Sequence, residues 1–303
     1  MTTMPKETHL PVCIWDVAAK LGEGPIWHAA TRSVYFVDIK GRQIHRCSED
    51  GSVRRSWSAP LQTGFIVPVA GGGGSGSFVV GMEDGLYNFD PDSGAFTLLR
   101  AIEQDVPTNR FNDGYVDAQG CLWFGSMDDG EALPSGSLYR LGGGAEVRTF
   151  DRDIIITNGP AVSPDGKTLY HTDTLGKLVF AFDVQDDGSL ANKRVFTEIT
   201  AGGHPDGMAV DSAGRVWIGI FNGARISRYA ADGTHIDDIA FPCSNITKLA
   251  FGGDDLRTVY VTTAWKGLSD EQRARQPQAG GLFTFRTDTP GLAQHEFLIE
   301  ATA

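Results

Sequence analysis

The segment Asp117-Ala-Gln-Gly-Cys-Leu-Trp-Phe124 decides the fold, because its pattern returns along the chain. A four-residue turn that opens with Asp and closes with Gly precedes a short apolar strand centred on Trp123. Asp or Ser at the first position and Gly at the fourth favour a type I turn, so a hairpin is expected here. The same order of turn and strand recurs in Ser163-Pro-Asp-Gly166 before Leu169-Tyr-His171 and in Asp211-Ser-Ala-Gly214 before Val216-Trp-Ile218.

Apolar strands of this kind recur at a nearly constant interval of 43 to 47 residues. Their central residues are Tyr35, Val79, Trp123, Tyr170, Trp217 and Tyr260. A second strand-like segment, another turn and a last strand follow each of them. Four short strands in ~45 residues is the period typical of a propeller blade. The sequence therefore predicts an all-β protein, a six-bladed β-propeller that occupies residues 1–303 as a single domain. Two β-sandwich domains are the main alternative, but they would not produce six nearly equal periods.

Closure of the ring requires one more strand from a chain terminus. Pro11-Val-Cys-Ile-Trp15 and His295-Glu-Phe-Leu-Ile299 are both suitable, and the sequence leaves the choice open. No segment shows a sustained 3.6-residue apolar period. The one helix expected is a surface turn over residues 269–275, with Ser269 as its N-cap.

Composition and charge exclude several classes of function. The 303 residues include 26 Lys and Arg against 38 Asp and Glu, a net charge of −12, and no basic cluster is present. We therefore expect neither a nucleic-acid partner nor an anionic membrane. No stretch approaches the ~18 apolar residues of a membrane helix. The chain start lacks the apolar segment of a signal peptide. The four cysteines are widely spaced without a Cys-x-x-Cys motif, which argues against a disulfide framework and against a thiolate zinc site. A reduced, cytoplasmic location and a monomer or weak oligomer are expected.

Polar residues recur at one phase of the repeat. The first strand of each propeller blade lines the central channel. Four blades place a carboxylate or amide 11 or 12 residues before the central aromatic residue, so these groups should converge at one mouth of the channel. The four residues are Glu23, Asn112, Asn158 and Asp206. The sixth repeat offers Asn245 and Thr247 a little further back, and the second offers only Gln62, Thr63 and Phe65.

Carboxylates and amides that share one cavity need a compensating charge, and oxygen ligands suit a hard or borderline divalent cation. For any single Asx-Gly pair, a turn residue repeated with the blade is the simpler interpretation. Glu23, Asn158 and Asp206 together favour a metal site, because Glu is a poor turn residue and its phase still matches. His204 is interpreted as a loop histidine before Pro205.

Several motifs, in chain order, resemble the senescence marker protein/gluconolactonase family, the regucalcin-like sugar lactonases. They are Leu21-Gly-Glu-Gly-Pro-Ile-Trp27, Arg110-Phe-Asn-Asp-Gly114, Thr157-Asn-Gly-Pro160, Pro205-Asp-Gly-Met-Ala-Val-Asp211 and Lys248-Leu-Ala-Phe-Gly-Gly253. The later stretch Thr262-Thr-Ala-Trp-Lys-Gly-Leu-Ser269 is similar to bacterial lactonases of the xylonolactonase type. In it, Trp265 is a weak candidate for a wall of the substrate site.

The resemblance implies one divalent ion in the channel, with Glu23, Asn158 and Asp206 as its ligands. Asp206 would also be the general base. Calcium, zinc, manganese and magnesium all occur in the family, and iron(II) is associated with the xylonolactonase-like branch, so iron(II) is slightly favoured.

The resemblance also implies a set of substrate contacts. Arg110 and Asn112 would hold the hydroxyl groups and ring of the sugar. The family often has a substrate-binding Glu, which the vertebrate-like pattern would place at Gly130. Glu131, one position later, resembles the bacterial version and is the residue expected here.

The predicted reaction is metal-dependent hydrolysis of a sugar (aldono-) lactone to its sugar acid, in pentose or hexose oxidation. The metal would polarise the lactone carbonyl, and Asp206 would take a proton from water. No Gly-x-Ser-x-Gly motif is present, so the nucleophile elbow of an α/β-hydrolase is unsupported. A metal-dependent esterase or phosphotriesterase and a non-catalytic metal-binding propeller scaffold remain alternatives. The sequence does not identify the sugar.

Overall fold

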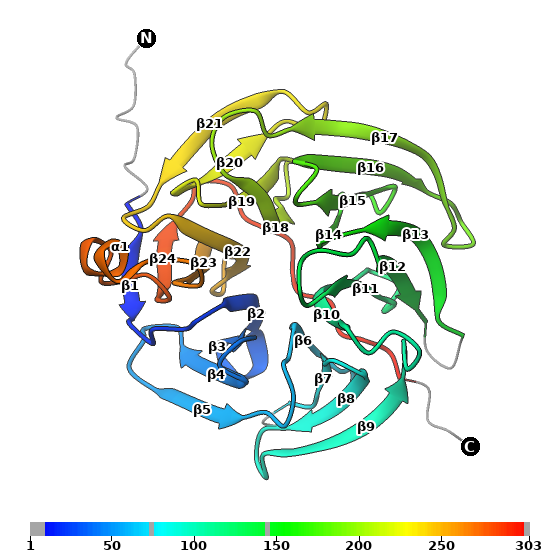
Figure 1. Ribbon diagram of the computed structural model, residues 1–303, viewed down its shortest axis with the longest axis horizontal. Helices are drawn as coiled ribbons and strands as arrows, with labels where there is room; N and C mark the ends of the chain where they lie inside the picture. Colours follow the sequence, from blue (N-terminus) through cyan, green and yellow to red (C-terminus); the bar gives the residue numbers. More distant parts are fainter. Residues whose placement is uncertain (1–9, 73–75, 143–145, 300–303) are drawn as a thin grey trace.

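Six antiparallel sheets of four strands each surround a central axis (Figure 1). The computed structural model describes residues 10–72, 76–142 and 146–299. In chain order the sheets are β2-β3-β4-β5, β6-β7-β8-β9, β10-β11-β12-β13, β14-β15-β16-β17, β18-β19-β20-β21 and β22-β23-β24-β1. The prediction of an all-β, six-bladed propeller is confirmed.

The strands of each blade run from the axis outward. The first strands are β2 (Gly22–His28), β6 (Phe65–Pro68), β10 (Asn109–Val116), β14 (Thr157–Val162), β18 (His204–Val210) and β22 (Asn245–Gly252). The second strands, which carry the repeated apolar triplets, are β3 (Ser33–Asp38), β7 (Phe78–Gly81), β11 (Leu122–Asp128), β15 (Thr168–Asp173), β19 (Val216–Phe221) and β23 (Thr258–Ala264). The third strands are β4 (Gln43–Ser48), β8 (Gly85–Asp90), β12 (Gly136–Leu141), β16 (Leu178–Val184), β20 (Arg225–Tyr229) and β24 (Leu282–Arg286). The outermost strands are β5 (Arg54–Ser58), β9 (Ala95–Ala101), β13 (Arg148–Ile154), β17 (Leu190–Glu198), β21 (His235–Ala240) and β1 (Val12–Trp15).

The central aromatic residues of the triplets pack between blades, as their phase predicts. Tyr260 of the sixth blade stacks on Trp27 of the first, with ring centroids 5.6 Å apart. Tyr35 of the first blade meets Phe78 of the second at 4.5 Å. Burying these rings is the main favourable term that holds one blade against the next.

The repeated Asp at the turn has a specific structural role. In the third blade, the Asp117 carboxylate accepts hydrogen bonds from the backbone N–H of Cys121 (2.9 Å) and from the indole of Trp123 (2.8 Å). In the fifth blade, Asp211 makes the same pair of contacts with Arg215 (3.0 Å) and Trp217 (3.0 Å). One side chain therefore fixes both the turn and the buried ring, which explains why the two recur together.

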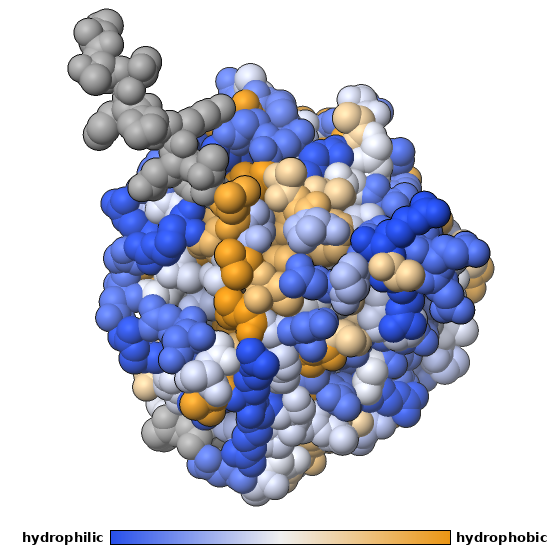
Figure 2. All heavy atoms as spheres, turned by 90° about the vertical axis from the view of Figure 1, so that its left-hand side faces the viewer, coloured by the Kyte–Doolittle hydropathy of each residue, from blue (hydrophilic) through white to orange (hydrophobic). Residues whose placement is uncertain are grey.

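The N-terminal strand closes the ring. β1 pairs with β24 in antiparallel register, with Val12 opposite Thr284, and so becomes the outermost strand of the sixth blade. Of the two closing strands that the sequence left open, the structure uses residues 12–15. The side of the molecule that carries β1 also shows a narrow hydrophobic band between hydrophilic surfaces (Figure 2). Val12, on this edge strand, is 59% exposed.

The C-terminal segment crosses the ring near its axis on the way to its end (Figure 1). Gly291 donates a backbone hydrogen bond to Leu256 of the sixth blade (2.8 Å), and Phe297 donates one to Pro68 of the second (2.8 Å). The side chain of Phe297 is buried among residues of the second and third blades. Residues 287–299 therefore tie separate blades together and do not add a strand to any of them.

One 3-10 turn and one short α-helix complete the described elements, η1 (Ala29–Thr31) and α1 (Asp270–Arg275). Ser269 caps α1 as predicted, in a capping box with Gln272. In the part of the chain that the structure describes, no helix has the length and apolar character needed to cross a bilayer.

Candidate active site

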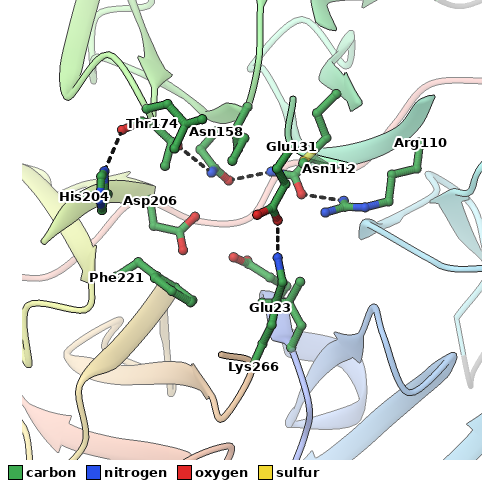
Figure 3. A pocket seen from close by; sticks show the side chains of 14 residues that line it. Glu23, Arg110, Asn112, Glu131, Asn158, Thr174, His204, Asp206, Phe221 and Lys266 are labelled. Carbon is green, nitrogen blue, oxygen red and sulfur yellow. Dashed lines mark hydrogen bonds and ion pairs between the residues drawn. The ribbon is translucent and has the colours of Figure 1, made fainter. Parts of the chain in front are cut away.

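A cavity of about 240 Å³ lies on the propeller axis, and we call it the axial cavity. All six residues predicted for the site line it, and they come from four different blades (Figure 3). They are Glu23, Arg110, Asn112, Glu131, Asn158 and Asp206. Three further polar side chains, Thr174, His204 and Lys266, also line it. An apolar part of the wall comes from Leu21, Met127, Ile156, Leu175 and Phe221.

A β-bulge follows or adjoins each polar residue on the first strands. The pairing register shifts between Glu23 and Ile26 on β2, and between Asn158 and Ala161 on β14. Equivalent shifts occur between Phe111 and Asp113 on β10 and between Pro205 and Met208 on β18. Bulges bend a strand and re-aim side chains, and they are common next to active sites. The repeated bulge therefore accounts for the convergence of four polar groups on the cavity.

The second and sixth blades differ from this pattern. β6 pairs with β7 without a register shift, and no β6 residue lines the axial cavity. β22 does contain a bulge, but Asn245 donates to the backbone of Lys266 (3.0 Å) and Thr247 donates to that of Gly22 (2.6 Å). Both side chains form hydrogen bonds with backbone oxygens nearby, and neither lines the cavity.

Gly24 fixes the carboxylate of Glu23. Its φ of +53° lies in the left-handed region, which favours glycine. In that conformation its backbone N–H donates to Glu23 Oε2 (2.9 Å). The Gly after Glu23 in the sequence motif is thus explained by the bulge.

A chain of hydrogen bonds orders the amides of the site (Figure 3). Arg110 Nη1 donates to Asn112 Oδ1 (2.6 Å), and Asn112 Nδ2 donates to Asn158 Oδ1 (2.8 Å). Asn158 Nδ2 in turn donates to Thr174 Oγ1 (2.9 Å). The second N–H of Asn112 is taken by the backbone oxygen of Thr157 (2.7 Å). Asn112 therefore orients the side chain of Asn158 as well as facing the cavity.

The guanidinium of Arg110 is buried and anchored from behind. Its Nε donates to Asp129 Oδ1 (2.7 Å), which also accepts from Lys40 (2.6 Å). Although burial raises the pKa of Asp129, hydrogen bonds from Lys40 and Gln62 and the charge of Arg110 lower it to about 2. Among the described residues Nη2 of Arg110 has no hydrogen-bond acceptor, so that edge can bind a ligand oxygen.

Glu23 and Asp206 form no direct ion pair among the described residues, although the charges of Lys248, Arg110 and Lys266 reach them. Glu23 and Asp206 are only 3% and 6% exposed. Burial, together with the charge of Asp113, raises the pKa of Glu23 to about 8. Burial and the charges of Glu23 and Asp113 raise the pKa of Asp206 well above its ordinary value. Such shifts mark groups whose negative charge needs compensation in this cavity.

The donor set fits a hard divalent cation. Two buried carboxylates and an amide oxygen, from three different blades, supply only oxygen ligands. No group of three or more His, Cys, Asp or Glu residues suited to a metal occurs in the described chain, so any ion held here would depend on the amide of Asn158. Glu23, Asn158 and Asp206 are the residues that could hold it.

Glu131 reaches the cavity from a loop that follows β11. The loop is shaped by Asp128, whose carboxylate accepts from the backbone N–H of Ala132 (2.9 Å) and Leu133 (3.1 Å). Glu131 itself has a φ of +57°, unusual for a residue with a side chain. Its carboxylate forms an ion pair with Lys266, from the loop after β23, across the cavity (Figure 3). Lys266 was not predicted, because nothing in its local sequence marks it.

Two sequence interpretations near the site need correction. His204 is not a loop histidine, since it opens β18 and lines the cavity, with Nδ1 3.3 Å from the backbone oxygen of Thr174. Trp265 does not line the cavity. Its indole donates to the backbone oxygen of Ala18 (2.9 Å), and its ring packs against Arg273. Its neighbour Lys266 lines the cavity instead.

The motifs that surround this cavity are those of one known family. Residues 21–265 match the family described as SMP-30/Gluconolactonase/LRE-like region. The chain belongs to this family. An L-arabinolactonase of Azospirillum brasilense is 37% identical over 286 residues, which cover 93% of this chain and 93% of that protein. A 6-deoxy-6-sulfogluconolactonase of Pseudomonas putida is 33% identical, over 94% of this chain and 97% of that protein.

Solved structures of the SMP-30/gluconolactonase family share the fold. The crystal structure of a calcium-binding protein, regucalcin, from Agrobacterium tumefaciens superposes with a TM-score of 0.88 at 27% identity. It covers 94% of this chain, and 96% of that protein is matched.

Proposed function

We propose that this chain hydrolyses a sugar (aldono-) lactone to the sugar acid, with the help of one divalent metal ion. The observation that carries the proposal is the meeting of Glu23, Asn158 and Asp206 with Arg110 in one small cavity. The relatives named above as lactonases support the reaction class, since a lactone is a cyclic carboxylic ester. The relative titled a calcium-binding protein supports a divalent ion.

The size and lining of the axial cavity suit a monosaccharide lactone. About 240 Å³ is less than the ~300–1,000 Å³ of sites that bind drug-sized ligands. The lining combines two kinds of wall residue, polar groups and the apolar Leu21, Ile156 and Phe221. A sugar ring has hydroxyl edges and C–H faces, which match these two kinds of wall.

A divalent ion held by Glu23, Asn158 and Asp206 would supply Lewis-acid polarisation of the lactone carbonyl. The oxygen of the attacking water forms a bond to the carbonyl carbon, and its proton passes to the Asp206 carboxylate. The ring C–O bond then breaks, and the ring oxygen takes the proton held by Asp206 to become a hydroxyl group, which returns Asp206 to its carboxylate form. Lactone and water thus give the hydroxy acid with no other reactant.

Arg110 and Glu131 would orient the substrate. The free edge of the Arg110 guanidinium can donate to ring or hydroxyl oxygens, while the Glu131 carboxylate can accept from hydroxyl groups. Glu131 already forms an ion pair with Lys266 across the cavity, so both charges have a partner before a substrate binds. The neutral hydroxyl groups of a sugar can form hydrogen bonds with Glu131 or Lys266 while the two charges stay paired with each other.

The proposal is tested by chelation and re-addition of single metals. The protein is stripped, reloaded separately with Fe²⁺, Zn²⁺, Mn²⁺, Mg²⁺ or Ca²⁺, and assayed in a pH-stat on five- and six-carbon aldonolactones. We expect turnover to be lost on stripping and restored by at least one ion. The Glu23→Gln variant should lose most of both metal binding and turnover, whereas Glu198→Gln, at an exposed position on β17, should lose neither.

Three results would contradict the proposal in different ways. Full turnover after chelation would show that the reaction does not need a metal ion. Faster turnover of phosphotriesters or simple esters than of any lactone would favour the esterase alternative. A tightly bound metal without turnover on any lactone would favour a non-catalytic scaffold.

A further inference from the structure

A buried ion pair lies close to the axial cavity. Asp113 on β10 and Lys248 on β22 are 1% and 6% exposed. Lys248 Nζ donates to Asp113 Oδ1, and lies 3.3 Å from the backbone oxygen of Gly114. The pair joins the third blade to the sixth across the axis, between residues 135 positions apart in the chain.

The pair lies between two cavities. On β10, Asn112 lines the axial cavity and Gly114 lines a second, smaller cavity. Asp113, the residue between them in the strand, therefore lies between the two cavities. The second cavity, which we call the lower cavity, is also lined by Lys248 and by residues 292–294 of the C-terminal segment. The Asp113–Lys248 pair therefore forms a partition on the propeller axis.

The partition adjoins the proposed metal ligands. The alkyl chain of Lys248 packs against Gly207, the residue directly after Asp206, where a Cβ atom would lie 2.6 Å from Lys248 Cβ. The Asp113 carboxylate is close enough for its charge to raise the pKa of both Glu23 and Asp206. Asp113 Oδ2 has no hydrogen-bond partner among the described residues, although the side chain is almost fully buried.

The charges of this buried group can be counted. Glu23, Asp206 and Asp113 contribute three negative charges when ionised, and Lys248 contributes one positive charge. Arg110 and Lys266, whose charges also reach Glu23 and Asp206, are each paired with another carboxylate and are left out of the count. The set therefore carries −2, which one divalent ion neutralises. Buried charges are stable only when compensated, so the count of fixed charges favours an ion of matching charge.

We propose that Asp113 and Lys248 are positioning residues, whose joint charge behind Glu23 and Asp206 matches the site to a divalent cation. The inference rests on the proposed metal site but concerns residues that do not bind the ion. With Asp113 neutralised, Lys248 becomes an unpaired cation that repels the metal. With both neutralised, the charge of −2 returns.

The test is the affinity for Mn²⁺, measured by titration calorimetry on stripped protein. We expect Asp113→Asn to raise the Kd at least about tenfold, because a buried charge within the site acts through a low dielectric. The double variant D113N/K248M should return to within about threefold of the wild-type Kd. Should that double variant not fold, D113N/K248Q serves in its place.

A matched control separates charge from folding. Asp117→Asn removes another buried carboxylate of β10's hairpin, one that pairs with Arg140 and Trp123 outside the cavity. It should lower the melting temperature and leave the Mn²⁺ Kd unchanged. An unchanged Kd in Asp113→Asn, or a double variant that binds as weakly as the single one, would overturn the inference alone. Absence of Mn²⁺ binding to the wild-type protein would instead overturn the metal site of the proposed function.

Discussion

Arg110 depends on a residue outside the cavity for its position. Its guanidinium is held by Asp129, which also accepts from Lys40 and Gln62. A buried cation that loses its carboxylate partner is left unpaired. Arg110 would then be held only by the hydrogen bonds of its Nη1. The geometry of the substrate contact therefore depends on Asp129.

Asp129→Asn should accordingly weaken substrate binding more than chemistry. We expect kcat/KM for the best lactone to fall about tenfold or more, mainly through KM, because Arg110 would touch the sugar in ground state and transition state alike. Steady-state kinetics check this, with Asp92→Asn, an exposed carboxylate on the turn between β8 and β9, as the control. A change confined to kcat would contradict the assigned role.

His45 gives the folded protein a defined sensitivity to acid. It is 2% exposed on β4, packs edge-on against Trp15 at 5.3 Å, and bonds Ser56 (2.8 Å). Burial lowers its pKa from 6.5 to about 4. Between those two values the unfolded chain binds a proton that the folded chain does not, so stability is lost as the pH falls from 6.5 to 4.

The expected contribution of His45 is up to about 1.4 kcal/mol per pH unit within that window. Urea unfolding at pH 7 and pH 5 should show a smaller loss of stability on acidification in His45→Gln than in the wild type. His235→Gln, at an exposed position, should behave as the wild type. Parallel losses in all three proteins would show that His45 does not titrate in this range.

Single residues of the site differed in how far the sequence could predict them. Glu23, Asn158 and Asp206 were predicted to share a cavity because each lies at a fixed phase of a repeat, and the structure brings them to one cavity. The Glu131–Lys266 and Asp113–Lys248 pairs each join residues 135 positions apart, in different phases of different blades. Such pairs are fixed by ring geometry, which no local pattern expresses.

The bulge in the first strand of four blades directs the repeated polar side chains into the axial cavity. Gly24 permits the bulge of β2, because its φ of +53° would strain any residue with a Cβ. A Cβ there would also lie 3.4 Å from Phe65 Cα, ordinary contact, so strain in the backbone outweighs crowding.

Gly24→Ala should therefore lower stability by about 1–2 kcal/mol and also weaken Mn²⁺ binding, since the N–H of residue 24 orients Glu23. Gly166→Ala is the matched control, because Gly166 has a φ of +74° and no atom within 4 Å of an added Cβ, in a turn outside the cavity. It should lose similar stability with an unchanged Mn²⁺ Kd. Equal Mn²⁺ affinity in both variants would show that the bulge does not position the carboxylate.

At the scale of the whole ring, closure rests on a strand of four residues. β1 is anchored by Trp15, which packs against Phe36 (5.7 Å) and His45 and lies beside Arg54 (5.7 Å). Val12, on the same strand, is 59% exposed. Trp15 thus packs β1 against the first blade, together with Ile14 of the same strand.

Trp15→Ala should destabilise the protein by about 3 kcal/mol, whereas Val12→Ala should cost less than about 0.5 kcal/mol. Denaturant titration measures both. A single transition with a lowered midpoint is expected for Trp15→Ala. Equal effects of the two changes would mean that backbone pairing with β24 alone closes the ring.

The architecture was predictable because it repeats. The spacing of Tyr35, Trp123 and Trp217 predicted the blade number, and the structure confirms it. The closing strand was not predictable, since residues 11–15 and 295–299 have similar strand patterns. The choice depends on which terminus reaches β24, and the other terminus instead crosses the ring, with Phe297 buried beside the second blade.

The pairing of β1 with β24 has a consequence for biosynthesis. The outermost strand of the last blade leaves the ribosome before any other strand of the propeller, whereas its partner, Leu282–Arg286, leaves after all the others. Until β24 has been made, β1 has no sheet to join, and the two outer faces of the growing arc of blades stay exposed to water. Newly made chains therefore pass through a long open stage in which molecular chaperones can bind these unpaired surfaces.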